Sequence, residues 1–167
     1  MNIRSEQPGD VAAIDDVNRA AFETDTESNL VRALREQAQP LVSLVADEDD
    51  GVIGHIMFSP VTLSSDPAAR IMGLAPMAVL PAKQRRGVGS ALVRAGLDEC
   101  RRLGFPAVVV VGHAGYYPRF GFVPASRFRL GSEYDVPDEV FMAIEIEAGA
   151  LRGKAGVIRY HPAFASA

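Results

Sequence analysis

The chain has 167 residues, of which 48% are hydrophobic and 23% are charged, and its formal net charge is −4. A length of this order fits one domain with a hydrophobic core of its own, so we expect residues 1–167 to form a single domain. The excess of acidic over basic residues disfavours a nucleic-acid partner. Cys100 is the only cysteine of the sequence, which excludes an intrachain disulfide and suits a reducing cytoplasm.

The N-terminal residues predict a short strand followed by two amphipathic helices. Ile3 and Arg4 have the character of a strand, and the charged residues around them leave no readable secretory signal. The sequence Pro8-Gly9-Asp10 favours a helix start, and Thr24 and Glu27 have the spacing of a capping box for a second helix. The apolar stripes of the two helices are Val11, Ile14, Val17 and Ala21, and then Leu30, Val31, Leu34 and Ala38.

Three strands are predicted next, and the third carries the longest apolar stretch of the chain. Residues 41–46 and 52–63 flank an acidic turn that ends in glycine, which is typical of a hairpin. A polar loop over residues 64–69 leads to a strand over residues 70–80. Its apolar stretch is about half of the roughly 20 residues that a membrane-spanning helix needs. We therefore expect a soluble protein without a membrane partner.

The second half of the chain predicts a crossover between two strands. The pattern from residue 86 to about residue 103 is that of an amphipathic helix, which ends before Gly104 and Pro106. Residues 107–111 are a valine-rich run of the kind that is buried on both faces of a sheet, so strand, helix and strand indicate a parallel crossover. Residues 139–147 and 157–160 predict further strands, and together these elements predict a mixed α/β sheet with flanking helices.

The loop before the helix of residues 86–103 has the features of an anion site. The first turn of a helix carries N–H groups without intrahelical partners, and Gly87 and Gly89 have no side chain to keep a ligand away from them. With the helix dipole these groups suit a diphosphate, and Arg85 and Arg86 can add charge-assisted contacts. The alternative is that both glycines only permit close packing of the helix.

Two other phosphate-binding motifs are excluded in this segment. A Walker loop places a lysine before its Ser or Thr, whereas Gly89 directly precedes Ser90. A dinucleotide fingerprint requires a third glycine where Leu92 stands and an acidic residue at the end of the next strand, where Val111 and Gly112 stand.

Two motifs make this region resemble a known family. Gln84-x-x-Gly87-x-Gly89 after an apolar strand is similar to the signature of the GNAT superfamily of N-acetyltransferases. Tyr117-Pro118-Arg119-Phe120-Gly121-Phe122 is similar to the Tyr-x-x-x-Gly-Phe segment of those enzymes. The motifs and the elements between them span roughly residues 71–123. The ending Tyr160-His161-Pro162-Ala163-Phe164 also resembles a bacterial subgroup of predicted acetyltransferases.

The resemblance implies a fold, a cosubstrate and an activity. The fold is a GNAT-like mixed, mostly antiparallel twisted sheet with flanking helices and one strand-helix-strand crossover that carries the cofactor loop. The activity is transfer of the acetyl group from acetyl-CoA to an amine of a small molecule or peptide by direct attack. The residues that the resemblance assigns to the cosubstrate are Met77, Ala78, Val79, Gln84, Arg85, Arg86, Gly87, Val88, Gly89 and Ser90. Residues 77–79 would present backbone groups to pantetheine and to the thioester carbonyl, and residues 85–90 would hold the pyrophosphate.

Tyr117 matches the family position whose phenol protonates the leaving thiolate of coenzyme A. A phenol with an ordinary pKa near 10 keeps its proton at pH 7 and can donate it to a thiolate that forms beside it. The alternative is a packing role in an aromatic cluster with Tyr116, Phe120 and Phe122.

Three residues, Glu27, His55 and His113, are candidates for the base that takes the proton of the amine. A chain of water molecules is the alternative to a side-chain base. Many family members carry a glutamate on the strand before the loop, but residues 71–80 contain no acid. Helix capping is the alternative role of Glu27. His55 alternates with apolar residues along a predicted strand, so its alternative role is that of a hydrogen-bonded residue of the sheet. His113 follows the strand of residues 107–111, where ligands of open α/β sheets bind.

Other interpretations remain open at this point. The missing strand glutamate suggests a non-catalytic acyl-CoA binding or sensing domain as the second hypothesis. We expect no metal, because no Cys/His cluster has the spacing of a zinc site. A homodimer is compatible with the sequence, and no motif specifies the acceptor.

Overall fold

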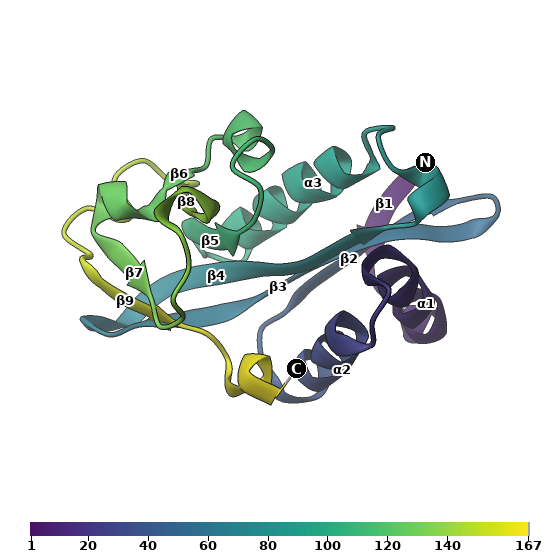
Figure 1. The fold of residues 1–167 in the computed structure, drawn as a ribbon, viewed down its shortest axis with the longest axis horizontal. Helices are drawn as coiled ribbons and strands as arrows, with labels where there is room; N and C mark the ends of the chain where they lie inside the picture. Colours follow the sequence, from purple (N-terminus) through teal and green to yellow (C-terminus); the bar gives the residue numbers. More distant parts are fainter. Residues whose placement is uncertain (167) are drawn as a thin grey trace.

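The computed structural model describes residues 1–166, which fold around one sheet of nine strands. Helix α3 covers one face of the sheet, and α1 and α2 cover the other, with the C-terminus beside α2 (Figure 1). The helices are α1 (Val11–Phe22), α2 (Thr26–Gln37) and α3 (Val88–Arg102). The strands are β1 (Asn2–Ser5), β2 (Val42–Glu48), β3 (Gly51–Leu63), β4 (Asp66–Val79), β5 (Ala107–Val111), β6 (Val123–Pro124), β7 (Leu130–Ser132), β8 (Phe141–Glu145) and β9 (Gly156–Arg159). Within residues 1–166 no helix has the length and apolar character needed to cross a membrane.

The strand order of the sheet is β1-β2-β3-β4-β5-β8-β6, and β9 pairs with the end of β3 and with β7. Neighbours along the main path are antiparallel except β4 and β5, which are parallel and are joined by α3. The predicted mostly antiparallel sheet with a strand-helix-strand crossover is therefore confirmed. The parallel pair β7 and β9 was not predicted.

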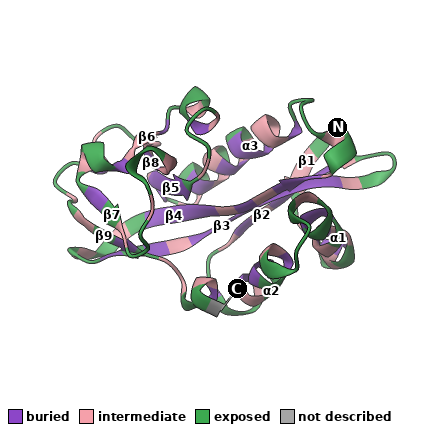
Figure 2. Cartoon of the chain, in the orientation of Figure 1, coloured by how far each residue is buried: buried purple, intermediate pink, exposed green. Residues whose placement is uncertain are grey.

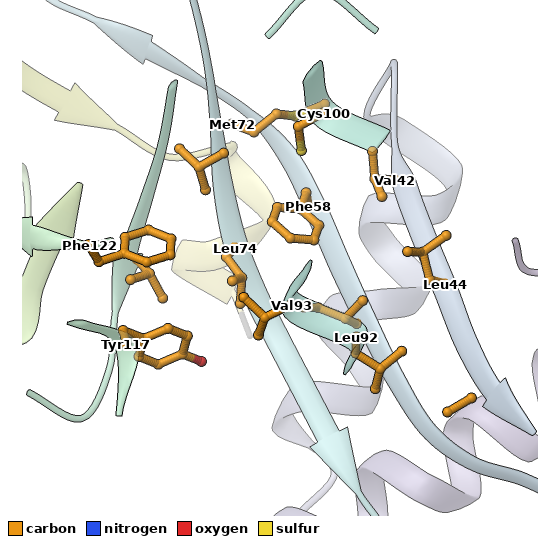
Figure 3. Packing of buried hydrophobic residues seen from close by; sticks show 14 of the residues in the cluster. Val42, Leu44, Phe58, Met72, Leu74, Leu92, Val93, Cys100, Tyr117 and Phe122 are labelled. Atoms are coloured by element: carbon orange, nitrogen blue, oxygen red, sulfur yellow. The ribbon is translucent and has the colours of Figure 1, made fainter. Parts of the chain in front are cut away.

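The core occupies both faces of the sheet because alternate residues of a strand point to opposite faces. On β3, Ile56 and Phe58 pack in the cluster beneath α3, while Met57 packs against α1 and α2. The interior strands are buried over most of their length, whereas the outer faces of the helices are exposed (Figure 2). In the α3 cluster, Phe58 lies close to Leu92 and Val93 (Figure 3). This arrangement fixes α3, and with it the loop that precedes it.

Strands β4 and β5 stay together for only part of their length. Ile71–Leu74 pair with Ala107–Val110, and the ladder stops there. On the other side of β4, Leu74 lies opposite Phe58 and Met77 lies opposite Ile56, so Ala75 and Pro76 form a bulge in the β3–β4 ladder. Strand β4 then continues to Val79 without β5 beside it. An open edge of the sheet results.

Several predicted boundaries were wrong. The loop predicted over residues 64–69 is mostly strand, because β4 begins at Asp66, directly opposite Leu63, after a two-residue turn. Helix α3 begins at Val88 rather than residue 86, because Gly87 takes a left-handed φ of 83° and forms the N-cap. The short strands β6 and β7 carry too few residues to show an alternating pattern.

The contact between α3 and β3 generates a stability prediction. A Cβ on Gly96 would overlap Phe58 Cε1, and the Phe58 ring is fully buried. Because overpacking a core typically costs about 1–3 kcal/mol, we expect Gly96→Val to lower the free energy of unfolding in urea by about 2 kcal/mol or more. Gly131→Val is the control, since nothing lies within 4 Å of a Cβ built there. Equal stability of the two variants would contradict this account.

Candidate active site

A cleft of about 1020 Å³ opens where β4 and β5 part. It is lined by the end of β4, the loop into α3, the first turn of α3, the segment after β5, and the facing ends of α1 and α2. The first part of that segment leads into a 3₁₀ turn, η3 (Tyr117–Phe120). The parting of the two strands therefore creates a space that elements from both faces of the sheet reach.

The first turn of α3 offers uncapped backbone amides to this cleft. Gly87 is the N-cap and makes no side-chain cap hydrogen bond, and the first intrahelical bond runs from Ala91 N to Gly87 O at 3.0 Å. The amides of Val88, Gly89 and Ser90 precede that bond and have no partner within the helix. Nothing lies within 4 Å of a Cβ built on Gly87, so the space in front of the turn is open. The arrangement suits an anion such as a diphosphate.

The loop residues differ in what they can contact. Lys83 and Arg85 line the cleft, and Arg85 takes a left-handed φ of 64°. Arg86 is exposed outside the cleft lining, and the Val88 side chain is buried in the core, so only the backbone of Val88 is available. Gln84 Nε2 donates to Val79 O at 3.0 Å. Gln84 thus fastens the loop to the strand end.

The free edge of β4 presents backbone groups to the cleft. Leu80 N donates to Ile53 O at 2.9 Å, which directs alternate residues of β4 toward β3. By this alternation Ala78 faces β3, whereas the backbone groups of Met77 and Val79 point away from β3 toward the cleft. Polar backbone groups at an open strand edge can bind an extended ligand as a further strand would.

Tyr117 projects from η3 into the same cleft and is 8% exposed. Its ring lies beside Phe122 at the edge of the α3 cluster (Figure 3), with ring centroids 5.7 Å apart. Gly112 permits this position, since a Cβ there would overlap the Tyr117 ring. Burial raises the pKa of Tyr117 to about 12. The phenol therefore holds its proton at neutral pH, and within residues 1–166 its hydroxyl has no hydrogen-bond partner.

Comparison with known proteins identifies the architecture. The model of the acetyltransferase (GNAT) family matches residues 11–122. The chain belongs to the GNAT family. The uncharacterized N-acetyltransferase YhbS of Escherichia coli K12 is 37% identical over 165 residues, which are 98% of each chain.

Two solved GNAT structures share the fold over almost the whole chain. The crystal structure of YhbS from Escherichia coli in complex with CoA has a TM-score of 0.92 and 36% identity, and the match covers 98% of this chain and 91% of that one. A GNAT family acetyltransferase from Brucella melitensis in complex with acetyl-CoA has a TM-score of 0.80 and 37% identity, covering 98% and 97%. The GNAT fold and its loop into α3 are thus present in this chain.

The three candidate bases lie in different surroundings. His113 is exposed and lines the cleft, and its carbonyl accepts the amides of Tyr116 at 3.0 Å and Tyr117 at 3.3 Å. Glu27 also lines the cleft. His55 does not. It is fully buried in β3, and the structure gives no support to its role as a base.

His55 belongs to a buried hydrogen-bonded network instead. Its Nδ1 lies 3.3 Å from Asn18 Nδ2, and its Nε2 lies 2.9 Å from Ser43 Oγ, which in turn donates to Glu6 at 2.6 Å. Burial lowers the pKa of His55 to about 4, so the imidazole is neutral at pH 7. Since an amide nitrogen can only donate, Nδ1 accepts and Nε2 carries the proton.

The predicted capping box at Thr24 and Glu27 is not formed. Helix α2 begins at Thr26 with Asp25 as the N-cap, and the Asp25 side chain makes no capping hydrogen bond, although Thr24 Oγ1 accepts Thr26 N at 3.4 Å. Thr24 Oγ1 instead donates to Glu27 Oε1 at 3.0 Å. Glu27 therefore makes no capping hydrogen bond to the helix backbone, and it is among the residues that line the cleft.

Sequence reasoning missed residues that share the cleft with Tyr117. Tyr116 places its hydroxyl 3.1 Å from Ser90 Oγ in the first turn of α3, and the Arg119 guanidinium stacks on its ring at 4.4 Å. A Cβ on Gly89 would lie only 3.0 Å from that hydroxyl. The doubled tyrosine at the start of the second motif was the available signal. Phe22 at the end of α1 carried no signal, because its place in the cleft depends on how α1 packs on the sheet.

Metal ligands are not gathered anywhere in the described chain. Residues 1–166 contain no group of three or more His, Cys, Asp or Glu side chains placed to hold an ion. Cys100 is buried in α3, and burial raises the pKa of its thiol to about 12. It packs as a small apolar residue.

The open space in front of Gly87 generates a binding prediction. A valine there would place a branched side chain in the path of the diphosphate, so we expect Gly87→Val to abolish measurable acetyl-CoA binding in calorimetry. The left-handed φ also strains any other residue by about 1–2 kcal/mol. Gly153→Val controls for that strain, since Gly153 has a φ of 72°, open space around it and no place in the cleft. Retained binding by a folded Gly87→Val variant would refute the diphosphate site.

Proposed function

We propose that this chain is an acetyl-CoA-dependent N-acetyltransferase that acts on an amine of a small molecule or peptide. One observation carries the proposal: the uncapped first turn of α3, the open edge of β4 and the phenol of Tyr117 all face the same cleft. The first group suits the diphosphate of coenzyme A, the second its extended pantetheine arm, and the third its sulfur. Relatives of similar size bind CoA or acetyl-CoA, and this supports the assignment.

The backbone holds most of the cosubstrate in this proposal. The amides of Val88, Gly89 and Ser90 bind the pyrophosphate, and Arg85 adds a charge-assisted contact. The backbone groups of Met77 and Val79 bind pantetheine and the thioester carbonyl. An amide N–H that faces this carbonyl stabilises the negative charge that develops on its oxygen.

The chemical step is a direct transfer. The neutral amine attacks the thioester carbon, a C–N bond forms, and the carbonyl oxygen takes the charge of the tetrahedral intermediate. As the intermediate collapses the C–S bond breaks, and Tyr117 protonates the leaving sulfur. His113, at the rim of the cleft, takes the proton that the amine gives up.

The second candidate is an acyl-CoA binding or sensing domain. It is favoured by the absence of a carboxylate over residues 71–79 of β4, where many GNAT members carry a glutamate. The two functions differ in turnover. A panel of amines with a thiol readout tests them, because a sensor binds acetyl-CoA in calorimetry and releases no thiol above the rate of hydrolysis.

Tyr117→Phe isolates the hydroxyl, because phenylalanine keeps the ring and its packing against Phe122. We expect turnover to fall about 10²-fold while acetyl-CoA affinity changes little. The pKa of about 12 means that Tyr117 stays protonated over the ordinary range, so wild-type activity should not fall through ionisation of this group below about pH 11. Wild-type turnover by folded Tyr117→Phe, with chemistry rate-limiting, would rule out the acid role.

His113→Ala tests the base. We expect the rate to fall more at pH 7 than at pH 9, because at higher pH the amine loses its proton to solvent without help. His161→Ala is the matched control, since His161 lies outside the cleft lining. A loss at His113 that does not depend on pH would mean that this side chain positions the substrate instead.

A further inference from the structure

The cleft carries opposite charge on its two sides. Its cationic side chains, Lys83, Arg85 and Arg119, belong to the loop after β4 and to η3. Lys83 pairs with Glu48 at 2.9 Å, so Arg85 and Arg119 carry the net positive charge of this side. The η3 segment packs against α3, where the Arg94 guanidinium lies 5.1 Å from the Phe120 ring centroid. From the other face of the sheet α1 and α2 reach the cleft, and Glu27 is the charged residue that they contribute. Since acetyl-CoA is a polyanion, the cationic side suits it and the acidic side is left for the acceptor.

Glu27 presents a carboxylate that is not neutralised by a neighbour. Thr24 Oγ1 donates to it, and within residues 1–166 no basic side chain forms an ion pair with it. Nearby acids differ in this respect, since Asp25 pairs with Arg19 at 3.1 Å and Asp15 pairs with Arg32 at 2.9 Å. A carboxylate that lines a cleft without a partner attracts a cationic group of a ligand.

An apolar surface adjoins this carboxylate. Phe22 is the last residue of α1, is 37% exposed, and lines the cleft together with Leu30 and Pro76. Glu23 then takes a left-handed φ of 61°, and its N–H bonds to Arg19 O at 2.9 Å, so the helix ends there and the chain turns into α2. This turn brings the end of α1 and the first turn of α2 to one cleft. An exposed ring in a cleft suits the hydrocarbon part of a ligand.

We propose, on the basis of the proposed function, that the acceptor is an amine whose apolar body packs on Phe22 and whose second positive group pairs with Glu27. A carboxylate beside the reacting amine would favour its charged form unless it acted as the base, and in the proposed function the base is His113. Glu27 therefore binds the far end of the acceptor. Among residues 1–166, no cationic side chain of α1 or α2 lines the cleft, so an acceptor carboxylate would be left unpaired on that side. The site thus selects diamines and guanidino amines over free amino acids.

Amines that differ by one carboxylate test this acceptor class. Thiol release from acetyl-CoA is measured with agmatine against arginine and with cadaverine against lysine. We expect kcat/KM to be about tenfold or more higher for the amine without the carboxylate in each pair. Equal kcat/KM within both pairs would overturn the acceptor class and leave acetyl transfer standing. Absence of thiol release with every amine, while acetyl-CoA still binds in calorimetry, would overturn both proposals.

Glu27→Gln tests the residue itself, because it removes the charge and keeps the shape. We expect kcat/KM for agmatine to fall about tenfold through KM, and that for phenethylamine, which has no second positive group, to change less than about threefold. Asp16→Asn is the matched control, since it removes an exposed charge of α1 outside the cleft lining and should leave both amines unaffected. An equal loss with both amines, or a loss in kcat that disappears at high pH, would place Glu27 at the reacting amine and overturn this assignment.

Discussion

The parting of two parallel strands is the constraint on which the rest of this molecule depends. Strands β4 and β5 share a ladder of only four residue pairs, and the bulge at Ala75 and Pro76 lies directly after it. A continuous ladder would satisfy the backbone of Met77 and Val79 within the sheet and would close the cleft. Because the ladder stops, the edge of β4 is free, and α3, which joins the two strands, begins with its first turn facing the gap.

The contacts that hold η3 in place also determine the ionisation of Tyr117. The Tyr117 ring packs against Phe122 and against the backbone of Gly112, and this burial raises the pKa of its phenol. Tyr116 bridges from that turn to Ser90 in the first turn of α3. The segment that presents the phenol is therefore held against the segment that presents the amides. Perturbed ionisation and a cleft occur together here, as they commonly do at functional sites.

Local features of the sequence were the predictable part. The periodicity of α3, the valine run of β5 and the glycine at position 87 each act within a few residues, so the crossover and its loop could be predicted from the chain alone. The remainder depends on tertiary structure. His55 looked like a base by residue type, but both faces of β3 are covered by helices, and the ring is enclosed between Asn18 and Ser43. Phe22 reaches the cleft because α1 packs across β3 and β4, a tertiary arrangement that side-chain patterns do not reveal.

The position of the cleft within the sheet has a kinetic consequence. Helix α3 lies on one face and α1 with α2 on the other (Figure 1). Residues of all three helices line the same opening. Under the proposed function the donor approaches from the α3 side and the acceptor from the α1–α2 side. Neither ligand then obstructs the route of the other, so a ternary complex can assemble in either order, and each product can leave without waiting for its counterpart. A covalent acetyl-enzyme, which a shared single entrance would favour, is unnecessary in such an arrangement.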